Sequence, residues 1–416
     1  MIAFPRREKK RVHLYGNVIE RSSFVFLKKM TTMRKIVLLG ATGSIGENTL
    51  KVLDGHRGKV QLAGIAANTR WRELAVIAKK YDVRHVAIFD ESAALAAEKS
   101  GDFPAGTRFY TGESGLCELT TLPEANLVVT AVVGTLGLRP TLAAIRSRKD
   151  VAVASKEILV LAGRFVMEAV QEYGVKILPV DSEHNAIFQC IGSEPQRHID
   201  RIILTASGGI FRDATLEEMA VARPADALKN PNWAMGPKVT VDSSTMANKG
   251  LELIEATWLF GIPQEKIDIV VHPQSIVHSM VKFTDGSVLA HLAPPSMTFP
   301  IQNCIFHPQR FDGVVPSLDF SQAMQLDFRA PDYEKYKCLR LARTCSREGG
   351  IFPAIFNASN EIAVDAFLRE QVPYLEIPEI IEKTLAKFPS RVPDSLDDIL
   401  AVDAEARRIA QSILTN

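Results

Sequence analysis

The sequence predicts an α/β protein with three parts: an N-terminal doubly wound domain, a central α+β domain and a C-terminal helical bundle. Three observations support this prediction. Short apolar strands alternate with helical patterns over residues 33–180, as in parallel sheets covered by helices on both faces. Residues 181–305 mix strands, glycine-rich turns and a hairpin signal. Residues 331–416 show only helical patterns, after an aperiodic linker over 306–330.

The composition is that of an ordinary soluble globular protein. The chain has 416 residues, of which 46% are hydrophobic and 23% charged, and its net charge is +1. This balance gives no indication of a nucleic-acid or membrane partner, and no apolar run reaches transmembrane length. The five cysteines are scattered, which favours a reducing, cytoplasmic compartment over a disulfide framework.

Residues 1–32 precede the first predicted strand, and we expect them to lie outside the fold. They are rich in Lys and Arg but lack an apolar core of secretory-signal length. Two interpretations stay open. The segment is either a targeting sequence, or it is untranslated because synthesis starts at Met30 or Met33.

A glycine-rich turn follows the first strand. Residues 35–39 form an apolar run, Gly40–Gly46 reads GATGSIG, and a helical pattern continues through Leu53. Glycines in such a turn let the backbone approach a pyrophosphate, and the helix N-terminus supplies free N–H groups. Strand, glycine turn and helix in this order predict a Rossmann-like nucleotide-binding unit.

The end of the second strand, residues 60–66, distinguishes between the two nicotinamide dinucleotides. An NAD enzyme places an acid near this point for the ribose hydroxyls. Here Ala67-Asn68-Thr69-Arg70 contains no acid, and Arg70 offers a partner for a 2′-phosphate, which favours NADP. The alternative is that Arg70 is a solvated residue at a helix start.

Further α/β elements complete the N-terminal domain. Strands are expected at residues 85–89, 127–133, 150–154 and 175–180, with helices over 74–81 and 138–146. Ligands in open α/β sheets bind beyond the carboxyl ends of the strands, and the last of these strands leads directly to two carboxylates.

Asp181 and Glu183 follow that last strand. Side chains alternate along an extended chain, so both carboxylates can point the same way, and such oxygen ligands suit Mg²⁺ or Mn²⁺. The alternative interpretation makes Asp181 a helix N-cap and puts Glu183 in the first turn, complementing the helix dipole.

The central region contains two candidate ligand-binding loops. A strand over 201–206 ends in Ser207-Gly208-Gly209, whose exposed N–H groups suit an oxyanion. The loop Asn230–Gly236 combines Pro, Gly and Trp233 and is interpreted as a lid, or else as a plain turn with a buried Trp. A strand over 267–271 leads to His272 and His278, each of which is either a structural histidine or a site residue.

A helical pattern then runs through Phe260. On such a helix Asn248, Lys249 and Glu252 share one face, which suits binding of a hydroxyl, a phosphate or enolate, and a metal. The alternative is a surface Lys–Glu pair. Gly250 within the helix costs about 1 kcal/mol relative to Ala, which indicates a packing or functional reason for it. Together these features suggest a metal-assisted oxidoreductase acting on a small phosphorylated substrate.

Seven motifs resemble the 1-deoxy-D-xylulose 5-phosphate reductoisomerase family over nearly the whole chain. These motifs lie at Gly40–Gly46, Leu178–Cys190, Ala206–Arg212, Asn230–Gly236, Val241–Ala256, His272–Val281 and Phe356–Leu368. The resemblance implies NADPH-dependent rearrangement and reduction of 1-deoxy-D-xylulose 5-phosphate to 2-C-methyl-D-erythritol 4-phosphate. It leaves open whether the rearrangement is a retro-aldol cleavage or a ketol migration, and it implies a homodimer.

The resemblance also implies residue roles. The metal ligands, Mg²⁺ or Mn²⁺ being the ion, are Asp181, Glu183 and Glu252, which with Lys249 form the catalytic set. The cofactor contacts are Thr42, Gly43, Ser44, Ile45, Ala67, Asn68, Thr69, Ser155, Glu157 and Gly236. The substrate contacts are Lys156, Ser182, Glu183, Ser207, Asn230, Trp233, Ser243, Asn248, Lys249 and Glu252.

Two departures from the family pattern keep alternatives open. Asn230 stands where the family usually has His, and Ser155 stands where it usually has Asn. The alternatives are an NADP-binding sensor without catalysis, which these two departures favour, and a related reductase acting on a different phosphosugar.

Overall fold

Two β-sheets organise the chain in the computed structural model, which describes residues 33–229 and 235–415. The first sheet has seven parallel strands in the order β4-β3-β2-β1-β5-β6-β7. The strands are β1 (Arg34–Leu39), β2 (Val60–Ala67), β3 (His85–Ile88), β4 (Arg108–Thr111), β5 (Leu127–Thr130), β6 (Asp150–Val153) and β7 (Ile177–Pro179). The strand order reverses between β1 and β5, where a ligand crevice is expected.

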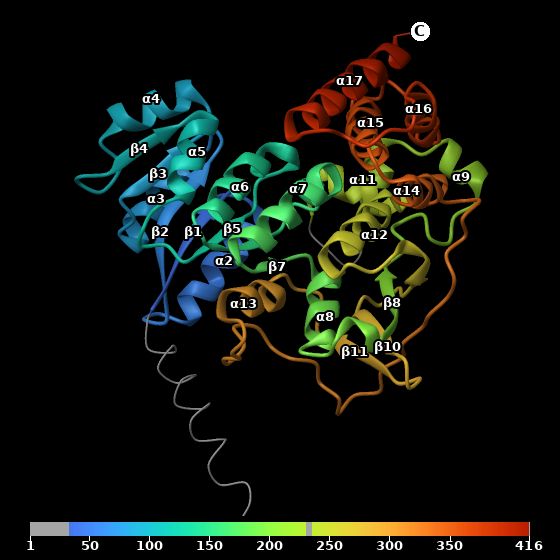
Figure 1. The fold of residues 1–416 in the computed structure, drawn as a ribbon, viewed down its shortest axis with the longest axis horizontal. Coiled ribbons are helices and arrows are strands. Elements are labelled where there is room, and N and C mark those ends of the chain that lie inside the picture. The colour runs from blue at the N-terminus through green and yellow to red at the C-terminus, as the bar shows by residue number, and fades with distance from the viewer. Residues whose placement is uncertain (1–32, 230–234, 416) are drawn as a thin grey trace, which may run out of the picture.

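Helices cover both faces of the first sheet (Figure 1). One face packs against α2 (Ser44–Gly55), α3 (Trp71–Tyr81), α4 (Glu91–Ser100) and α13 (Thr298–Phe306). The other packs against α5 (Gly112–Thr120), α6 (Leu138–Arg146) and α7 (Glu157–Tyr173). The predicted doubly wound, Rossmann-like domain is therefore confirmed.

The second sheet has four strands in the order β11-β10-β8-β9. They are β8 (Ile199–Ala206), β9 (Ile267–Val271), β10 (Val277–Phe283) and β11 (Val288–Leu292). The pair β8 and β9 is parallel, whereas β10 runs antiparallel to both β8 and β11. The predicted hairpin joins β10 to β11 at Asp285 and Gly286, where the Phe283 N–H donates to the Ser287 carbonyl at 2.9 Å.

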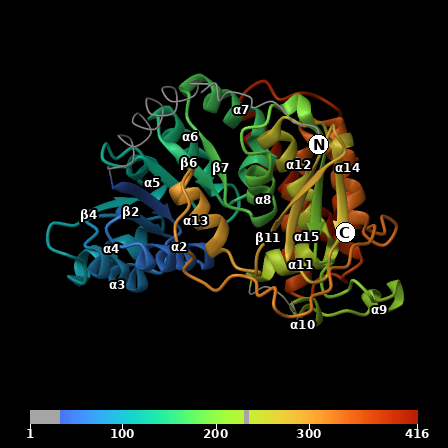
Figure 2. The same ribbon diagram turned by 90° about the horizontal axis from the view of Figure 1, so that it is seen from below.

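Helices connect this sheet to the rest of the molecule. They are α8 (Ser182–Ile191), α9 (Leu216–Ala220), α10 (Pro224–Ala227), α11 (Pro237–Thr245) and α12 (Ala247–Phe260). Figures 1 and 2 show α8 and α13 lying between the two sheets, and α8 contacts both β10 and α13. The carboxylates that begin α8 are therefore held between the two halves of the molecule.

Four helices complete the chain: α14 (Lys337–Glu348), α15 (Phe352–Leu368), α16 (Glu376–Leu385) and α17 (Leu396–Leu414). They follow a segment over 307–336 that contains no helix or strand and runs along the outside of the second sheet (Figure 1). At the contact between α12 and α14, a Cβ on Gly250 would lie 2.4 Å from the Cβ of Ala342. Close helix packing therefore explains this glycine.

Two expectations about individual elements need correction, and three further elements had not been expected. The apolar run 127–133 leaves the sheet after Thr130, because Ala131, Val132 and Val133 line a pocket instead. The pattern through Phe260 forms two helices, because Met246 is left-handed, with φ at +61°. Three elements over 91–120 were not predicted.

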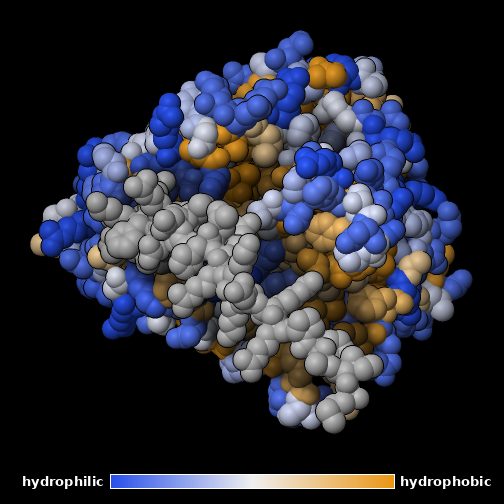
Figure 3. Space-filling model, turned by 60° about the horizontal axis from the view of Figure 1, so that its bottom comes forward, coloured by the Kyte–Doolittle hydropathy of each residue, from blue (hydrophilic) through white to orange (hydrophobic). Residues whose placement is uncertain are grey.

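The expected extension, residues 1–32, lies outside the described residues, as does most of the proposed lid, residues 230–234. Within the described ranges, no helix is both long and apolar enough to cross a membrane. The face drawn in Figure 3 carries hydrophobic patches between hydrophilic margins.

Candidate active site

The glycine turn lies at the point where the strand order reverses. Gly40 has a φ of +82°, and a Cβ on it would lie 2.2 Å from the Ala131 carbonyl oxygen at the end of β5. A Cβ on Gly46 would lie 2.4 Å from the Gly40 oxygen. No side chain caps the N-terminus of α2, so its backbone N–H groups are available for a phosphate. The turn therefore fits a pyrophosphate through its backbone.

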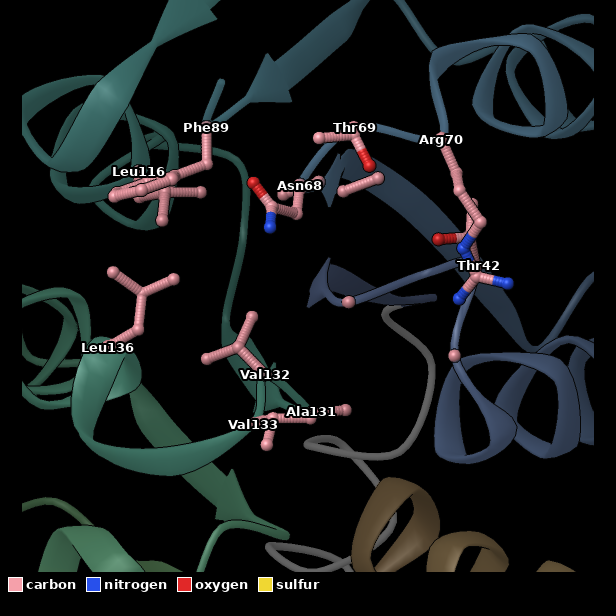
Figure 4. Close-up of a pocket in the computed structure, with 14 residues that line it drawn as sticks. Thr42, Asn68, Thr69, Arg70, Phe89, Leu116, Ala131, Val132, Val133 and Leu136 are labelled. Carbon is pink, nitrogen blue, oxygen red and sulfur yellow. The ribbon is translucent and has the colours of Figure 1, made fainter. Parts of the chain in front are cut away.

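A cavity of about 210 Å³, the cofactor pocket, opens beside this turn (Figure 4). Its lining residues are Gly40, Thr42, Gly43, Ala66, Ala67, Asn68, Thr69, Arg70, Phe89, Leu116, Ala131, Val132, Val133 and Leu136. Arg70 and Thr42 lie together on one side of it, and the apolar side chains of Phe89, Leu116 and Leu136 lie on the other. Arg70 is the only charged residue in this lining, so the pocket joins one cationic end to an apolar wall.

Three carboxylates lie close together, as predicted, in a cavity that the glycine turn also lines. Asp181, Glu183 and Glu252 each offer an oxygen within 4.8 Å of the others. Glu252 comes from α12 and is 1% exposed, whereas the other two begin α8. An all-oxygen set of this kind suits a hard divalent cation, so these residues fit the metal that was expected here.

The route by which the carboxylates converge differs from the alternation first considered. Strand β7 ends at Pro179, Asp181 is the residue before α8, and Glu183 lies in the first turn. The backbone positions are thus those of the N-cap alternative, yet the Asp181 side chain makes no capping hydrogen bond. It points instead to Lys156, with Oδ2 2.6 Å from Nζ.

Two lysines gather at the carboxylates. The Lys156 ammonium lies 3.0 Å from Glu252 Oε1 and donates to Asn248 Oδ1 at 2.8 Å. Lys249 donates to Glu183 Oε1 at 2.7 Å and also contacts Glu252. The two ammonium groups offset part of the negative charge of the three carboxylates, so a bound divalent cation would share these oxygens with two lysines.

These contacts shift the pKa values of the carboxyls in opposite directions. Burial raises the pKa of Asp181, but the nearby cations Lys156 and His184 and its hydrogen bonds together hold the pKa well below its usual value. Burial and repulsion by Glu252 raise the pKa of Glu183 although Lys249 opposes them. Burial lowers the pKa of Lys249, yet the two glutamates raise it overall. Asp181 is therefore ionised and Lys249 protonated near neutral pH.

A buried His–Glu pair lies behind the carboxylates. His184 Nδ1 is 3.1 Å from Glu255 Oε2, and its Nε2 is 2.9 Å from the Glu252 carbonyl oxygen. Burial lowers the pKa of His184, but Glu255 raises it to about 9, so the ring carries a positive charge near neutral pH. With Asp181 they form a second possible cation-binding set, but neither lines a pocket, and they pair with each other.

The predicted oxyanion loop follows β8. Gly208 and Gly209 have φ values of +79° and +66°, and a Cβ on Gly209 would lie 2.7 Å from the Ser243 carbonyl oxygen. Tyr336 donates its hydroxyl to the Gly208 carbonyl at 3.0 Å. The loop thus depends on two glycines and is held by a residue just before α14.

A second cavity of about 370 Å³, the substrate pocket, joins these groups. Besides the three carboxylates and two lysines, its lining includes the predicted residues Gly43, Ser44, Ile45, Ser182, Ser207, Gly236, Ser243 and Asn248. His272, His278 and Met297 also border it. The pocket shares Gly43, Ala131 and Val133 with the cofactor pocket, so the two cavities are contiguous at the glycine turn.

Four predicted residues are not assembled in this way. Ser155 and Glu157 line neither pocket; the Ser155 hydroxyl donates to the Gly134 carbonyl at 2.8 Å, and Glu157 pairs with Lys238 at 3.0 Å. Asn230 and Trp233 lie outside the described residues.

Sequence reasoning missed several lining residues. Ala131 to Val133 were assigned to a strand, although the end of β5 beside the glycine turn would have marked them as pocket residues. Met235 and Val239 carry no local signal of function, because apolar side chains are as typical of a core.

The chain is similar to known proteins along most of its length. Three family models match: "1-deoxy-D-xylulose 5-phosphate reductoisomerase" over residues 36–163, its C-terminal domain over 177–260, and "DXP reductoisomerase C-terminal domain" over 292–409. The 1-deoxy-D-xylulose 5-phosphate reductoisomerase of Heliobacterium modesticaldum is 46% identical over 379 residues, covering 91% of this chain and 97% of its own.

Two solved structures are similar throughout. The reductoisomerase from Zymomonas mobilis in complex with NADPH is 43% identical, with a TM-score of 0.86, and the match covers 92% of this chain and 99% of the other. A crystal structure of DOX-P reductoisomerase in complex with NADPH, fosmidomycin and magnesium is 37% identical, with a TM-score of 0.88 and coverage of 92% and 98%.

Proposed function

Because this chain belongs to the 1-deoxy-D-xylulose 5-phosphate reductoisomerase family, we propose how its residues carry out that family's reaction. The reaction is the NADPH-dependent rearrangement and reduction of 1-deoxy-D-xylulose 5-phosphate to 2-C-methyl-D-erythritol 4-phosphate, in the non-mevalonate route to isoprenoid precursors. The observation that carries the proposal is the meeting of Asp181, Glu183 and Glu252 beside the glycine turn. NADPH and a divalent metal, Mg²⁺ or Mn²⁺, are its cofactors.

The glycine turn and the cofactor pocket bind NADPH, which supplies the hydride when bound. Backbone N–H groups at the start of α2 donate hydrogen bonds to the pyrophosphate oxygens. Thr42, Gly43, Ser44 and Ile45 surround it, and Ala67, Asn68 and Thr69 lie toward the adenosine phosphate. Arg70 adds a cation at that end of the pocket, where a 2′-phosphate gains a charge-assisted hydrogen bond.

Asp181, Glu183 and Glu252 hold the divalent metal, which when bound supplies Lewis-acid polarisation of the substrate's carbonyl and hydroxyl oxygens. Lys156 and Lys249 are protonated neighbours of these carboxylates. Their ammonium groups stabilise negative charge that develops on substrate oxygen. Asn248 lies between them and orients a substrate hydroxyl, since its amide already contacts Glu252.

The substrate phosphate binds at the oxyanion loop. Ser207, the N–H of Gly208 that follows it, and Ser243 line the cavity and offer hydroxyl and backbone donors. Ser182 and Gly236 border the same cavity. Asn230 and Trp233 stay predicted as a substrate contact and a lid residue that limits the access of water.

Three parts of the chain have separate functions in this proposal. We assign NADPH binding to residues 33–180, the metal and substrate to 181–305, and support of the substrate loops to 331–416, with 306–330 as the linker. Tyr336 and Tyr374 support this last role, because their hydroxyls donate to the Gly208 carbonyl at 3.0 Å and to Ser244 Oγ at 2.9 Å.

The assembly is a homodimer in the cytoplasm. Strand β11 is at an edge of the second sheet, and its Val288 and Leu289 side chains are 47% and 51% exposed, which supports an interface there. Light scattering of the purified protein tests this, with Leu289→Lys expected to yield monomers. The five cysteines are all free, which supports a reducing compartment.

The decisive experiment is an absorbance assay of NADPH oxidation with 1-deoxy-D-xylulose 5-phosphate. Turnover is expected with Mn²⁺ or Mg²⁺ and is abolished by EDTA, then restored by excess metal. An absence of turnover at any metal concentration would favour the NADP-binding sensor, and turnover only with another compound from a phosphosugar panel would favour the related reductase.

A further inference from the structure

A buried ionic cluster beside the substrate pocket takes no part in the chemistry described above. The Lys238 ammonium lies 3.0 Å from Glu157 Oε1 and 2.8 Å from Asp242 Oδ2. Asp242 is 1% exposed and Glu157 8%. Two buried carboxylates around one ammonium group are expensive to assemble, which indicates that the cluster serves a purpose beyond stability.

The cluster joins three distant parts of the chain. Glu157 begins α7 directly after the turn that follows β6, and Lys238 and Asp242 lie on α11. From α15, Asn360 donates to Asp242 Oδ1 at 2.9 Å. On the other side, Ser155 donates to Glu157 Oε2 at 3.0 Å. Every charged group of the cluster is therefore held from at least two directions.

Lys156 lies between two members of this network. Its backbone is the turn residue between Ser155 and Glu157, both of whose side chains are fixed by hydrogen bonds. Its own ammonium extends the other way, to Asp181 at 2.6 Å and to Glu252 at 3.0 Å. The hydrogen bonds of Ser155 and Glu157 thus fix the backbone of Lys156, from which its side chain extends to the carboxylates.

Helix α11, which forms another part of the substrate pocket's wall, is connected to the same cluster. Gly236, Val239 and Ser243 of the α11 segment line the substrate pocket, and Lys238 lies among them in sequence. Its ion pair with Glu157 consequently connects α11 to the turn that carries Lys156. Without the Lys238 charge, the two buried carboxylates would repel each other, and the turn would move away from α11.

We propose that Lys238 is a positioning residue: its ion pair with Glu157 holds the turn of residues 155–157 and so fixes the Lys156 amine at the metal-binding carboxylates. The inference rests on the proposed function for its kinetic consequences, but not for the geometry itself. It also gives Glu157 a role in the protein framework, in addition to the cofactor contact that the family resemblance implies.

The first test measures Lys156 directly, without substrate, metal or NADPH. The purified full-length protein is labelled with trace acetic anhydride, and acetylation of each lysine is quantified by mass spectrometry. Lys238→Met, which keeps the length of the side chain but removes its charge, is expected to speed labelling of Lys156 about fivefold or more, because an amine released from Asp181 and Glu252 becomes accessible to the reagent. Unchanged labelling of Lys156 would overturn the proposal.

The second test is a double-mutant cycle on turnover. Lys238→Met is expected to lower kcat/KM about ten- to a hundredfold, as a small displacement of a catalytic group does, with the dissociation constant for NADPH unchanged. In the Lys156→Ala background the same substitution should change kcat/KM less than about threefold. Equal losses in both backgrounds, or a loss confined to NADPH affinity, would overturn it.

Companion variants keep the test interpretable. Lys238→Arg retains the charge and should recover most of the activity. Glu157→Gln loosens the turn but leaves the Lys238–Asp242 pair, so it replaces Lys238→Met in both tests if that variant does not fold. Lys282→Met removes an exposed pair with Asp200 at 2.8 Å and serves as the matched control. Wild-type protein without turnover would defeat the proposed function, yet the labelling experiment would still decide this inference.

Discussion

The cofactor pocket and the substrate pocket are contiguous but are built on different principles. The cofactor pocket relies on backbone: Gly40, Gly43 and the free N-terminus of α2, with Arg70 as the one charged residue among its described lining residues. The substrate pocket relies on side-chain charge, with Glu252 and Lys249 only 1% and 3% exposed. A backbone site tolerates side-chain change but not an added Cβ, whereas a charged site tolerates neither loss nor rearrangement of its charges.

The largest effect should come from a change that removes one charge from the substrate pocket. Glu252→Gln is expected to reduce kcat about a thousandfold or more, because a metal ligand and the partner of two lysines are lost together. NADPH binding, followed by fluorescence titration, should be unchanged, since Glu252 lines only the substrate pocket. Parallel losses of turnover and NADPH affinity would erase the distinction between the pockets.

A second prediction concerns how the contribution of Glu157 to folding stability depends on pH. Burial raises the pKa of Glu157, but Lys238, a backbone hydrogen bond and Lys156 together lower the pKa to about 2, below the ordinary value near 4.5. A lowered pKa stabilises the fold fully above the unfolded-state value, and this stability is lost as pH falls through about 4.5 toward 2.

Chemical denaturation between pH 7 and pH 2.5 checks this. The free energy of unfolding of the wild type should exceed that of Glu157→Gln by a margin that shrinks with acidification, by up to about 3 kcal/mol. Besides Lys238, the Lys156 ammonium also lowers this pKa, so the Lys156→Ala variant should show a smaller margin. A margin independent of pH would contradict the prediction.

A smaller effect is expected from adding one methyl group to the backbone-built pocket. In Gly46→Ala the new Cβ would approach the Gly40 and Ala41 carbonyl oxygens to 2.4 and 2.5 Å, and the turn must shift. NADPH affinity should fall about tenfold to a hundredfold, given the usual energy of such overpacking. Gly101→Ala is the control: its added Cβ has no atom within 4 Å, although the φ of +69° strains the backbone there, and it should bind NADPH normally because it lies outside the pocket.

The smallest effect should come from the single cation of the cofactor pocket. Arg70→Ala is expected to raise the KM for NADPH about tenfold by removing one charge-assisted hydrogen bond, while the KM for NADH stays the same. Steady-state kinetics with both cofactors measures this. An equal rise for both would mean that Arg70 supports the fold of the pocket and does not recognise the 2′-phosphate.

Features that are formed by consecutive residues could be predicted from the sequence. Strand, glycine turn and helix over residues 35–53 are contiguous, so the first pocket could be located from one short stretch. The helical spacing of Asn248, Lys249 and Glu252 likewise predicted a shared face. In the structure both Asn248 and Lys249 contact Glu252, and Lys156 donates to Asn248.

Other features depend on contacts between distant segments, and the residues alone could not predict them. Residue order gives Asp181 and Glu183 the same spacing in a strand or in a helix start, so only the fold could decide between those routes. Lys238 carries no motif, and its partner Glu157 is 81 residues earlier in the sequence. Its other partner, Asp242, is in turn bound by Asn360, which is 118 residues later. The meeting of the three carboxylates was inferred from family resemblance rather than from spacing.

Helix α13 comes late in the chain, yet its Ile301, Cys304 and Ile305 complete one core of the first sheet, where α13 packs against α2 and β7. Residues of α15 and α17 close the opposite face. A truncated protein ending near residue 180 would expose both apolar surfaces of its sheet, and would aggregate rather than persist as a separate nucleotide-binding module. Synthesis of nearly the full chain must therefore precede formation of either core, which makes the molecule one cooperative unit.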